Sequence, residues 1–299
     1  MKVRSWLFGV YIAALVIYSC FTLIPAPDPL TLLRYHISAT GLRLLDVSII
    51  VLLVGIWFAG FYGYTKLQEY SKLIQADKDG KQIAWLTKGL LLLVLWLPVS
   101  EVASSILNYY ALKHPGSQAA ATIIDNYLNL LFPLVGFVLI GIGARGLTRL
   151  TRFKPTFWMP NLLYLGIIYV GLIYYRLMVT THGRAQVYHL SIWMMLLTLA
   201  APYIFMWSTG LVATYELYRY QHKVAGVVYR RSWDMLALGL GWLIVTTILF
   251  QYLTTLVNRL SSLSIYWVLA IVYSVLAVLS VGFILIALGA KKLKKIEEV

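Results

Sequence analysis

Residues 135–150 read Val-Gly-Phe-Val-Leu-Ile-Gly-Ile-Gly-Ala-Arg-Gly-Leu-Thr-Arg-Leu, and residues 281–296 read Val-Gly-Phe-Ile-Leu-Ile-Ala-Leu-Gly-Ala-Lys-Lys-Leu-Lys-Lys-Ile. The two stretches align without a gap, and each runs from an apolar segment into a basic one. A match between the middle and the end of a chain indicates an internal duplication. The apolar part of each stretch is also typical of a helix in a membrane.

Apolar segments of this kind recur along the whole chain. Of its 299 residues 61% are hydrophobic and 12% are charged, whereas about 25% of the residues of a soluble domain are charged. A helix needs about 20 mostly apolar residues to cross a bilayer. The sequence therefore predicts an all-α, polytopic bundle of about eight transmembrane helices, over residues 5–25, 42–64, 84–107, 123–146, 157–179, 187–214, 232–254 and 264–290.

Lys and Arg are distributed unevenly around these spans. Eighteen of the 25 belong to the termini and alternate loops, and Lys88 lies just inside a span on the same side, which makes nineteen. The opposite side has six, namely Arg34, Arg43, Lys113, Arg176, Arg184 and Arg259. Because Lys and Arg accumulate on the cytoplasmic side of membrane proteins, we expect both termini in the cytoplasm. Attraction to anionic headgroups accounts for the net charge of +14, so we expect the lipid bilayer and not nucleic acid as partner.

The duplication extends to other spans. Four spans are an even number, so both halves would insert with the same orientation, related by an axis along the membrane normal. We predict a first four-helix repeat over residues 1–152 and a second over residues 153–299. Chance similarity between Leu-rich helices is the alternative. The supporting matches are Tyr35–Ser38 with Tyr188–Ser191, Leu95–Leu97 with Gly241–Leu243, and Trp57, Gly60, Leu67 and Tyr70 with Trp207, Gly210, Leu217 and Tyr220.

The N-terminal segment has two interpretations. Basic residues before an apolar run are typical of a cleaved signal peptide, but the duplication gives the first span a counterpart later in the chain and favours a retained helix. The single Cys20 excludes an intrachain disulfide and a multi-cysteine metal site.

Ionisable side chains within the spans are candidates for function because their insertion into a bilayer is costly. Glu101 lies about 25 Å along the third span from its cytoplasmic end, in the outer leaflet. An outward-facing polar vestibule is one interpretation of this level of the bundle. Side chains that simply lie where water reaches the interface are the other. The candidates for substrate binding are Glu101, Asp125, Asn126, Asn129, Arg176, His36 and His189.

The two halves differ at these positions. In the alignment Glu101 faces Thr247, while Asp125 and Asn129 face Ile271 and Val275. The first half also has Pro98 and Pro133 where the second has Ile244 and Leu279. Proline removes a main-chain hydrogen bond from a helix. We therefore expect a site or a hinge within residues 96–133, with Pro98 and Pro133 as hinge candidates.

Signatures of catalysis are absent from the sequence. It contains no HExxH, no GxSxG, no Walker loop and no GxGxxG, so we expect no enzyme, no catalytic residue, no cofactor and no metal site. Asp77-Lys-Asp79-Gly80 begins like a calcium loop, but no bidentate Glu follows, and a solvated turn is the favoured interpretation. Haem ligation by His36 and His189 is a less favoured alternative to two interfacial histidines.

One resemblance accompanies these patterns. Tyr35-His-Ile-Ser38, Leu44-Leu45-Asp46, Ile56-Trp-Phe-Ala-Gly-Phe-Tyr-Gly63 and Asp79-Gly80 are similar to segments of uncharacterised polytopic membrane proteins from Saccharibacteria-type candidate-phylum bacteria. The similarity covers about residues 35–110. The group has no assigned activity, so no functional residue is implied. The resemblance implies a bacterial cytoplasmic membrane.

The sequence favours a small transporter or channel-like protein, because tandem parallel repeats are frequent in transporters. The first alternative is a non-catalytic membrane anchor or scaffold of a larger assembly, which would bind protein partners through its basic loops. A membrane-embedded enzyme or receptor is the second alternative. The substrate and the oligomeric state are not indicated by these residues.

Overall fold

The computed structural model describes residues 2–23, 38–75, 79–114, 118–149, 201–222, 227–259 and 265–297. These residues form helices and contain no strand, which confirms the all-α prediction for the described part of the chain. The helices are α1 (Lys2–Leu23), α3 (Ala39–Leu73), α4 (Gly80–Lys113), α5 (Gln118–Arg149), α8 (Ala201–Gln221), α9 (Val227–Arg259) and α10 (Ile265–Glu297).

Five of the described helices are long and apolar enough to cross a membrane: α3, α4, α5, α9 and α10. The chain is therefore a multi-pass membrane protein, as predicted. Each of these helices is longer than its predicted span; α3 has 35 residues and measures about 52 Å at 1.5 Å per residue. A hydrocarbon core is about 30 Å thick, so the helix ends reach into the headgroup region or beyond it. The span predicted over 157–179 lies outside the described residues.

Local sequence fixes where α3 begins and where α4 follows it. The Ser38 hydroxyl caps α3 by accepting a hydrogen bond from the Gly41 N–H at 3.0 Å. Such a cap satisfies one of the donors that a helix start leaves open. At the other end of α3, a side chain on Gly80 would collide with the carbonyl oxygen of Ile74. The tight turn into α4 therefore requires glycine.

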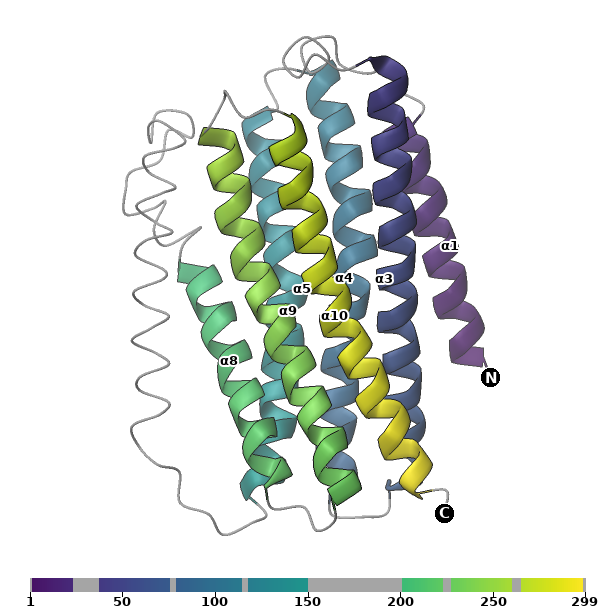
Figure 1. The fold of residues 1–299 in the computed structure, drawn as a ribbon, viewed down its shortest axis with the longest axis vertical. Coiled ribbons are helices and arrows are strands. Elements are labelled where there is room, and N and C mark those ends of the chain that lie inside the picture. Colours follow the sequence, from purple (N-terminus) through teal and green to yellow (C-terminus); the bar gives the residue numbers. More distant parts are fainter. Residues whose placement is uncertain are drawn as a thin grey trace.

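The helices form a bundle in which helices distant in sequence lie side by side (Figure 1). In that bundle α4 packs against α5, and α9 packs against α10. Two further interfaces join the halves of the chain, between α3 and α10 and between α5 and α8. Helix α1 contacts α3 and α4 at one side of the bundle. The N- and C-termini both lie toward the end that carries the α3–α4 and α8–α9 turns (Figure 1).

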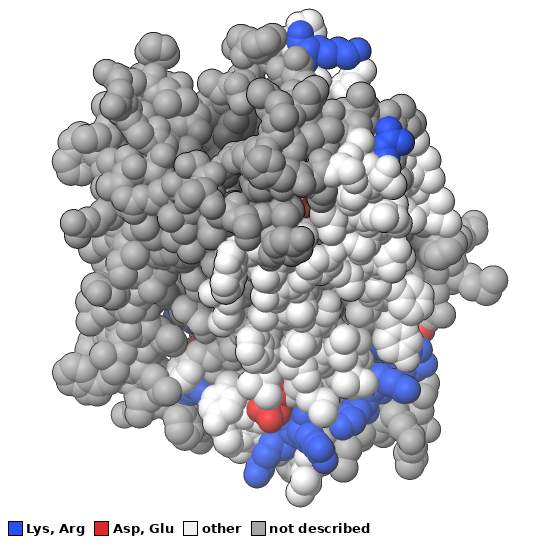
Figure 2. Space-filling model, turned by 45° about the horizontal axis from the view of Figure 1, so that its top comes forward, with Lys and Arg blue, Asp and Glu red and all other residues white. Residues whose placement is uncertain are grey.

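Basic side chains gather at this same end, which we call the basic end of the bundle. In Figure 2 the visible Lys and Arg lie mainly along the lower edge, and a broad band without charge lies above them. The polarity of the bundle thus follows the charge asymmetry of the sequence. The described basic residues here are Lys66, Lys72, Lys81, Lys88, Arg145, Arg219, Arg230, Arg231, Lys291, Lys292 and Lys294, and those near the opposite end are Arg43 and Lys113.

Glycines allow the closest helix approaches. A Cβ on Gly89 of α4 would lie 2.6 Å from the carbonyl oxygen of Gly136 on α5. A Cβ on Gly239 of α9 would lie 2.7 Å from the carbonyl oxygen of Gly282 on α10. Small residues at such crossings let membrane helices pack backbone to backbone. The α4–α5 and α9–α10 pairs therefore cross in the same way.

The two interfaces between the halves also share their contacts. Gly60 of α3 faces the Phe283 ring of α10, and a Cβ added at Gly60 would lie 3.0 Å from that ring. Gly210 of α8 faces the Phe137 ring of α5, at 3.3 Å by the same measure. One turn along α3, Gly63 meets Ala287. At the α5–α8 interface the corresponding contact has the two residue types exchanged, because Gly141 of α5 lies next to Ala213 of α8.

These contacts correct part of the sequence alignment. Between α5 and α10 the matching glycines are Gly136 and Gly282, which the alignment also pairs. Between α4 and α9 the matching glycines are Gly89 and Gly239, which the alignment does not pair. The pairing of Leu95–Leu97 with Gly241–Leu243 was therefore wrong, by about one helical turn. The alignment was displaced by about one turn of helix, and such a displacement still places apolar residues of α4 opposite apolar residues of α9.

The centre of the bundle is apolar on the side of the basic end. A small cavity of about 30 Å³ there is lined only by apolar residues. Most of them come in pairs from the two halves: Leu67 and Leu217, Leu86 and Leu236, and Ile140 and Ile286. Two of the three fully buried tryptophans among the described residues, Trp57 and Trp207, also occupy matching positions on α3 and α8.

Candidate functional site

A polar cluster joins α4 to α5 toward the end opposite the basic end. The Ser104 hydroxyl of α4 donates a hydrogen bond to Oδ1 of Asp125 on α5. The Asn129 amide, one turn along α5, donates to the same oxygen at 3.2 Å. It also donates to the main-chain oxygen of Asp125 at 3.1 Å. Asp125 is thus a partly buried carboxylate held by donors from both helices.

Glu101 lies one turn before Ser104 on α4. Its side chain is partly buried and close enough to Asp125 for the two carboxylates to interact electrostatically. One turn further along α4, the Ser105 hydroxyl donates a hydrogen bond to the main-chain oxygen of Glu101 at 2.8 Å. Among the residues that the structure describes, no Lys, Arg or His forms an ion pair with either carboxylate.

The prolines of this region lie inside continuous helices. Pro98 is buried within α4 and Pro133 is buried within α5. Pro133 has no N–H, so the carbonyl of Asn129 lacks the donor that it would have in a regular helix. Near Pro98, the buried Ser100 hydroxyl donates to the main-chain oxygen of Leu97 at 3.1 Å. Both prolines therefore lie within one or two turns of the carboxylates, and their role as hinges stays a prediction.

The other predicted site residues are not part of the described cluster. Asn126 belongs to α5, but its side chain is not described. His36, Arg176 and His189 lie outside the described residues. The structure therefore brings together Glu101, Asp125 and Asn129 out of the seven substrate-binding candidates, and adds Ser104 as the direct link between the helices.

The corrected pairing of α4 with α9 changes the counterpart of Glu101. When Gly89 is aligned with Gly239, Glu101 corresponds to Gln251 of α9 and not to Thr247. Glu and Gln have nearly the same size and shape, so the halves differ here in charge and not in volume. Asp125 and Asn129 keep Ile271 and Val275 as counterparts, because the pairing of α5 with α10 is unchanged.

Two neighbouring carboxylates have limited chemistry available in a membrane. Like charges repel strongly where the dielectric constant is low, so such a pair is stable when it shares a proton or binds a cation. A multi-ligand metal centre needs more donors. Within the described residues, no group of three or more His, Cys, Asp or Glu side chains lies together. The arrangement therefore suits a proton or a singly charged cation.

The chain matches no protein-family model, no curated protein and no solved structure.

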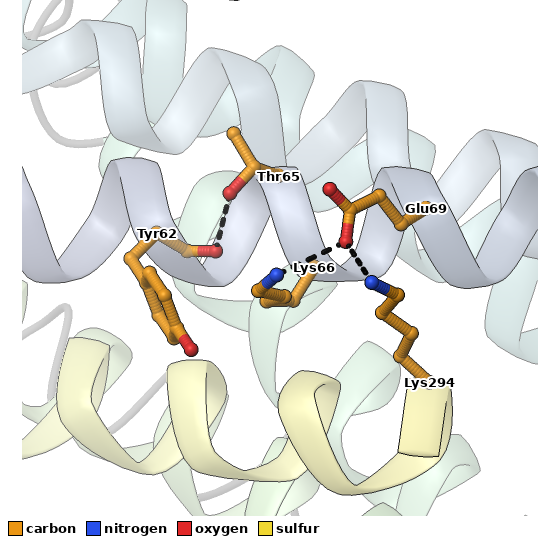
Figure 3. Close-up of polar contacts among 5 residues, drawn as sticks. All are labelled: Tyr62, Thr65, Lys66, Glu69 and Lys294. Carbon is orange, nitrogen blue, oxygen red and sulfur yellow. Dashed lines mark hydrogen bonds and ion pairs between the residues drawn. The ribbon is translucent and has the colours of Figure 1, made fainter. Parts of the chain in front are cut away.

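A charged cluster at the basic end was missed by the sequence analysis (Figure 3). Glu69 Oε2 of α3 lies 3.1 Å from Lys66 Nζ on the same helix and 2.8 Å from Lys294 Nζ on α10. The spacing of Lys66 and Glu69 could have indicated their ion pair. The contact with Lys294 depends on the packing of α3 against α10. On α8 the matching pair, Glu216 and Arg219, has its charges in the reverse order at 3.9 Å.

A second missed contact anchors the α3–α4 turn. Tyr220 of α8 donates a hydrogen bond to Oδ2 of Asp79 at 2.9 Å. Burial, followed by the negative charge of Asp79, raises the pKa of Tyr220, so its hydroxyl stays neutral and remains a donor. The sequence predicted a solvated turn at Asp77–Gly80. Asp79 is only partly exposed and is held by another helix, and no sequence pattern pointed to Tyr220 as its partner.

Proposed function

We propose that the protein is a small membrane transporter that binds a proton or a singly charged cation between Glu101 and Asp125. The observation that carries this proposal is the electrostatic proximity of the Glu101 and Asp125 carboxylates on α4 and α5, without a basic partner among the described residues. Intramembrane acids that face protein are typical of ion and proton pathways. Ser104 and Asn129 would hold Asp125 in place for such a ligand.

The apolar centre supports an outward-facing arrangement of this transporter. The carboxylates lie toward the end opposite the basic end, whereas the centre near the basic end is lined by leucine and isoleucine pairs. A cation at Glu101 would thus be separated from the basic end by close apolar packing. Transport through this bundle would require the halves to move relative to each other, as in proteins with repeated units. Pro98 and Pro133 are the positions where α4 and α5 would bend.

The proposal includes eight spans in a bacterial cytoplasmic membrane, with both termini in the cytoplasm. It also includes two parallel four-helix repeats, residues 1–152 and 153–299. The paired interfaces support the repeats, since the same kinds of contact recur when α3, α4 and α5 are matched in chain order with α8, α9 and α10. The gathering of basic residues near the termini supports the orientation.

A non-catalytic scaffold is the second candidate, favoured by the same apolar centre. A bundle that never opens would have a packed centre and would use its basic end to bind protein partners. Glu101 then has only a local role in packing. The two candidates differ in what happens when the Glu101 charge is removed.

The test uses the full-length protein in lipid nanodiscs and compares wild type with Glu101→Gln. Infrared spectra report a protonated carboxyl group through its C=O stretch, and thermal unfolding in Na⁺, Li⁺ or guanidinium reports cation binding. We expect the wild type to show one of these signals and Glu101→Gln to lack it. A ligand at 100 times its Kd would stabilise the protein by about 2.7 kcal/mol.

Asp46→Asn is the matched control, because it neutralises a half-buried carboxylate on α3, which is outside the α4–α5 cluster. It should keep the wild-type signal. A wild type without a protonated carboxyl and without a cation response would contradict the transporter proposal. If the wild type does respond to an ion, that ion should cross the membrane of proteoliposomes that contain wild type. It should not cross the membrane of proteoliposomes that contain Glu101→Gln.

A further inference from the structure

A cleft of about 490 Å³ lies between α3 and α4 at the basic end. This volume is in the range of pockets that hold small molecules. The cleft is lined by the last turns of α3 and the turn that follows, from Tyr64 to Gln75, and by the first turns of α4, from Gly80 to Leu91. A cleft of this size on a membrane protein is filled by water, lipid or another ligand. Its lining shows which of these fits.

Three lysines line the cleft: Lys72 on α3, and Lys81 and Lys88 on α4. All three are exposed, and none forms an ion pair with a carboxylate among the described residues. Lys88 Nζ lies 4.8 Å from the centre of the Trp85 ring. Lys66 and Lys294 differ from these lysines, because both form an ion pair with Glu69. The described lining of the cleft therefore carries three positive charges and no carboxylate.

The cleft is polar at one end and apolar at the other. Helix α3 runs toward the basic end and α4 runs away from it, so Tyr64 and Leu91 mark the end nearer the membrane centre. Gln75 and Lys81 mark the end nearer the solvent. Trp85 lies between these ends in sequence, and Trp side chains favour the headgroup level. The lysines and the hydrogen-bonding side chains Gln68 and Ser71 thus lie where lipid phosphates lie.

We propose that this cleft binds the phosphate-bearing headgroup of an anionic phospholipid from the leaflet at the basic end. Lys72, Lys81 and Lys88 would neutralise the phosphate, and Ser71 and Gln68 would donate hydrogen bonds to it. The acyl chains would leave along the apolar surface near Leu91. Basic pockets between transmembrane helices on the cytoplasmic side are known to hold anionic headgroups. The proposal does not depend on Glu101 or on transport.

The second half of the chain lacks the same set of charges. In the pairing that matches Gly89 with Gly239, Lys72, Lys81 and Lys88 correspond to His222, Arg231 and Leu238. Asp234 replaces Ala84 of the cleft and adds a negative charge. The chain thus contains its own comparison site, which has one of the three cations and a carboxylate. We expect the anionic lipid to bind between α3 and α4 and not between α8 and α9.

The experiment measures lipid binding to the full-length protein by native mass spectrometry. Phosphatidylglycerol and phosphatidylcholine with identical acyl chains are titrated onto wild type, the cleft variant Lys72→Gln/Lys81→Gln/Lys88→Gln and a control variant. The control, Arg230→Gln/Arg231→Gln/Lys291→Gln, removes the same charge from exposed positions at the same end. Each lysine near the surface contributes about fivefold to the attraction of anionic lipid. We expect the cleft variant to lose at least tenfold in phosphatidylglycerol affinity and the control to lose less than half as much.

Three results would overturn the proposal. Wild type could bind both lipids equally, or the control could lose as much affinity as the cleft variant, which would indicate a diffuse surface charge. Glycerol 3-phosphate could displace the lipid at equal concentration, which would indicate a soluble phosphate ligand. Each single variant, Lys72→Gln, Lys81→Gln and Lys88→Gln, should weaken binding severalfold. These variants keep the test decisive if the triple variant fails to fold.

Discussion

Lys294 of α10 reaches Glu69 of α3 across the interface between the two halves of the chain, with Nζ 2.8 Å from Oε2 (Figure 3). Both side chains are about three-quarters buried, with exposed fractions of 24% and 20%. Lys66 shares the same carboxylate oxygen at 3.1 Å. One carboxylate thus joins two cations where α3 and α10 leave the apolar part of the bundle. Its removal would leave two partly buried lysines close together.

We predict that Glu69→Gln lowers the free energy of unfolding by about 1–2 kcal/mol, between the values for exposed and for buried ion pairs. Glu69→Lys should cost more, and Lys294→Glu in the same chain should restore part of the loss. Thermal unfolding of the two single variants and the double variant measures this coupling. The exposed Lys291→Gln is the control and should leave stability unchanged. Additive effects in the cycle would show that the pair is not coupled.

The glycine crossings give a second prediction. Gly89→Ala and Gly239→Ala should each destabilise the protein by about 1–3 kcal/mol, because the added methyl group collides with the facing helix backbone. The two losses should be similar, since the two crossings have the same geometry. Gly55→Ala is the control, because nothing lies within 4 Å of its built Cβ. Equal stability of all three variants in detergent unfolding would contradict the close approach at the crossings.

The sequence predicted the helical class and the apolar part of five spans, because a run of about 20 apolar residues is typical of a transmembrane helix. It did not predict how far the helices continue beyond the spans, because their ends are polar and lack the apolar run from which a span is recognised. The α4–α9 alignment failed because a shift of about one turn keeps the helix phase. For the site, Glu101, Asp125 and Asn129 could be named because carboxylate and amide side chains are rare within an apolar span. The contacts of Glu69 with Lys294 and of Asp79 with Tyr220 could not, because they depend on how distant helices pack.

Membrane orientation can be tested with cysteine labelling on a Cys20→Ser background. The turn residue Gly80 is unsuitable because any side chain there collides with Ile74. Gln75 and His114 are exposed at the ends of α3 and α4 and are suitable labelling positions. We expect His114→Cys to react with an impermeant thiol reagent in intact cells and Gln75→Cys to react only after permeabilisation. The opposite pattern would place the basic end outside the cell.

The hydrogen bond from Tyr220 to Asp79 should stabilise the α3–α4 turn. Tyr220→Phe removes a donor to a carboxylate, and we predict a loss of about 1.5–3 kcal/mol. Because burial raises the pKa of Tyr220 above its ordinary value, this contribution is complete below pH 10 and declines only at higher pH. The loss should therefore be the same at pH 6 and pH 9. Tyr218→Phe is the control, since Tyr218 is 45% exposed; an equal loss there would remove the special role of Tyr220.

Glu101→Gln separates folding from function at the proposed site. The variant gives α4 the residue type that α9 has at the corresponding position, Gln251, so the bundle should accept it. Removing one of two neighbouring carboxylates also removes repulsion between them. We therefore expect Glu101→Gln to accumulate in the membrane at the wild-type level and to unfold at the same or a higher temperature.

Asp125→Asn should behave differently, because Ser104 and Asn129 both donate to Asp125 and its replacement disturbs the link between α4 and α5. We predict a loss of about 1–3 kcal/mol in stability for this variant. Quantified membrane abundance and thermal unfolding of the two variants side by side make the comparison. If Glu101→Gln abolished accumulation while Asp125→Asn did not, Glu101 would be the structural residue of the pair. The cation site would then have to be abandoned in favour of the scaffold.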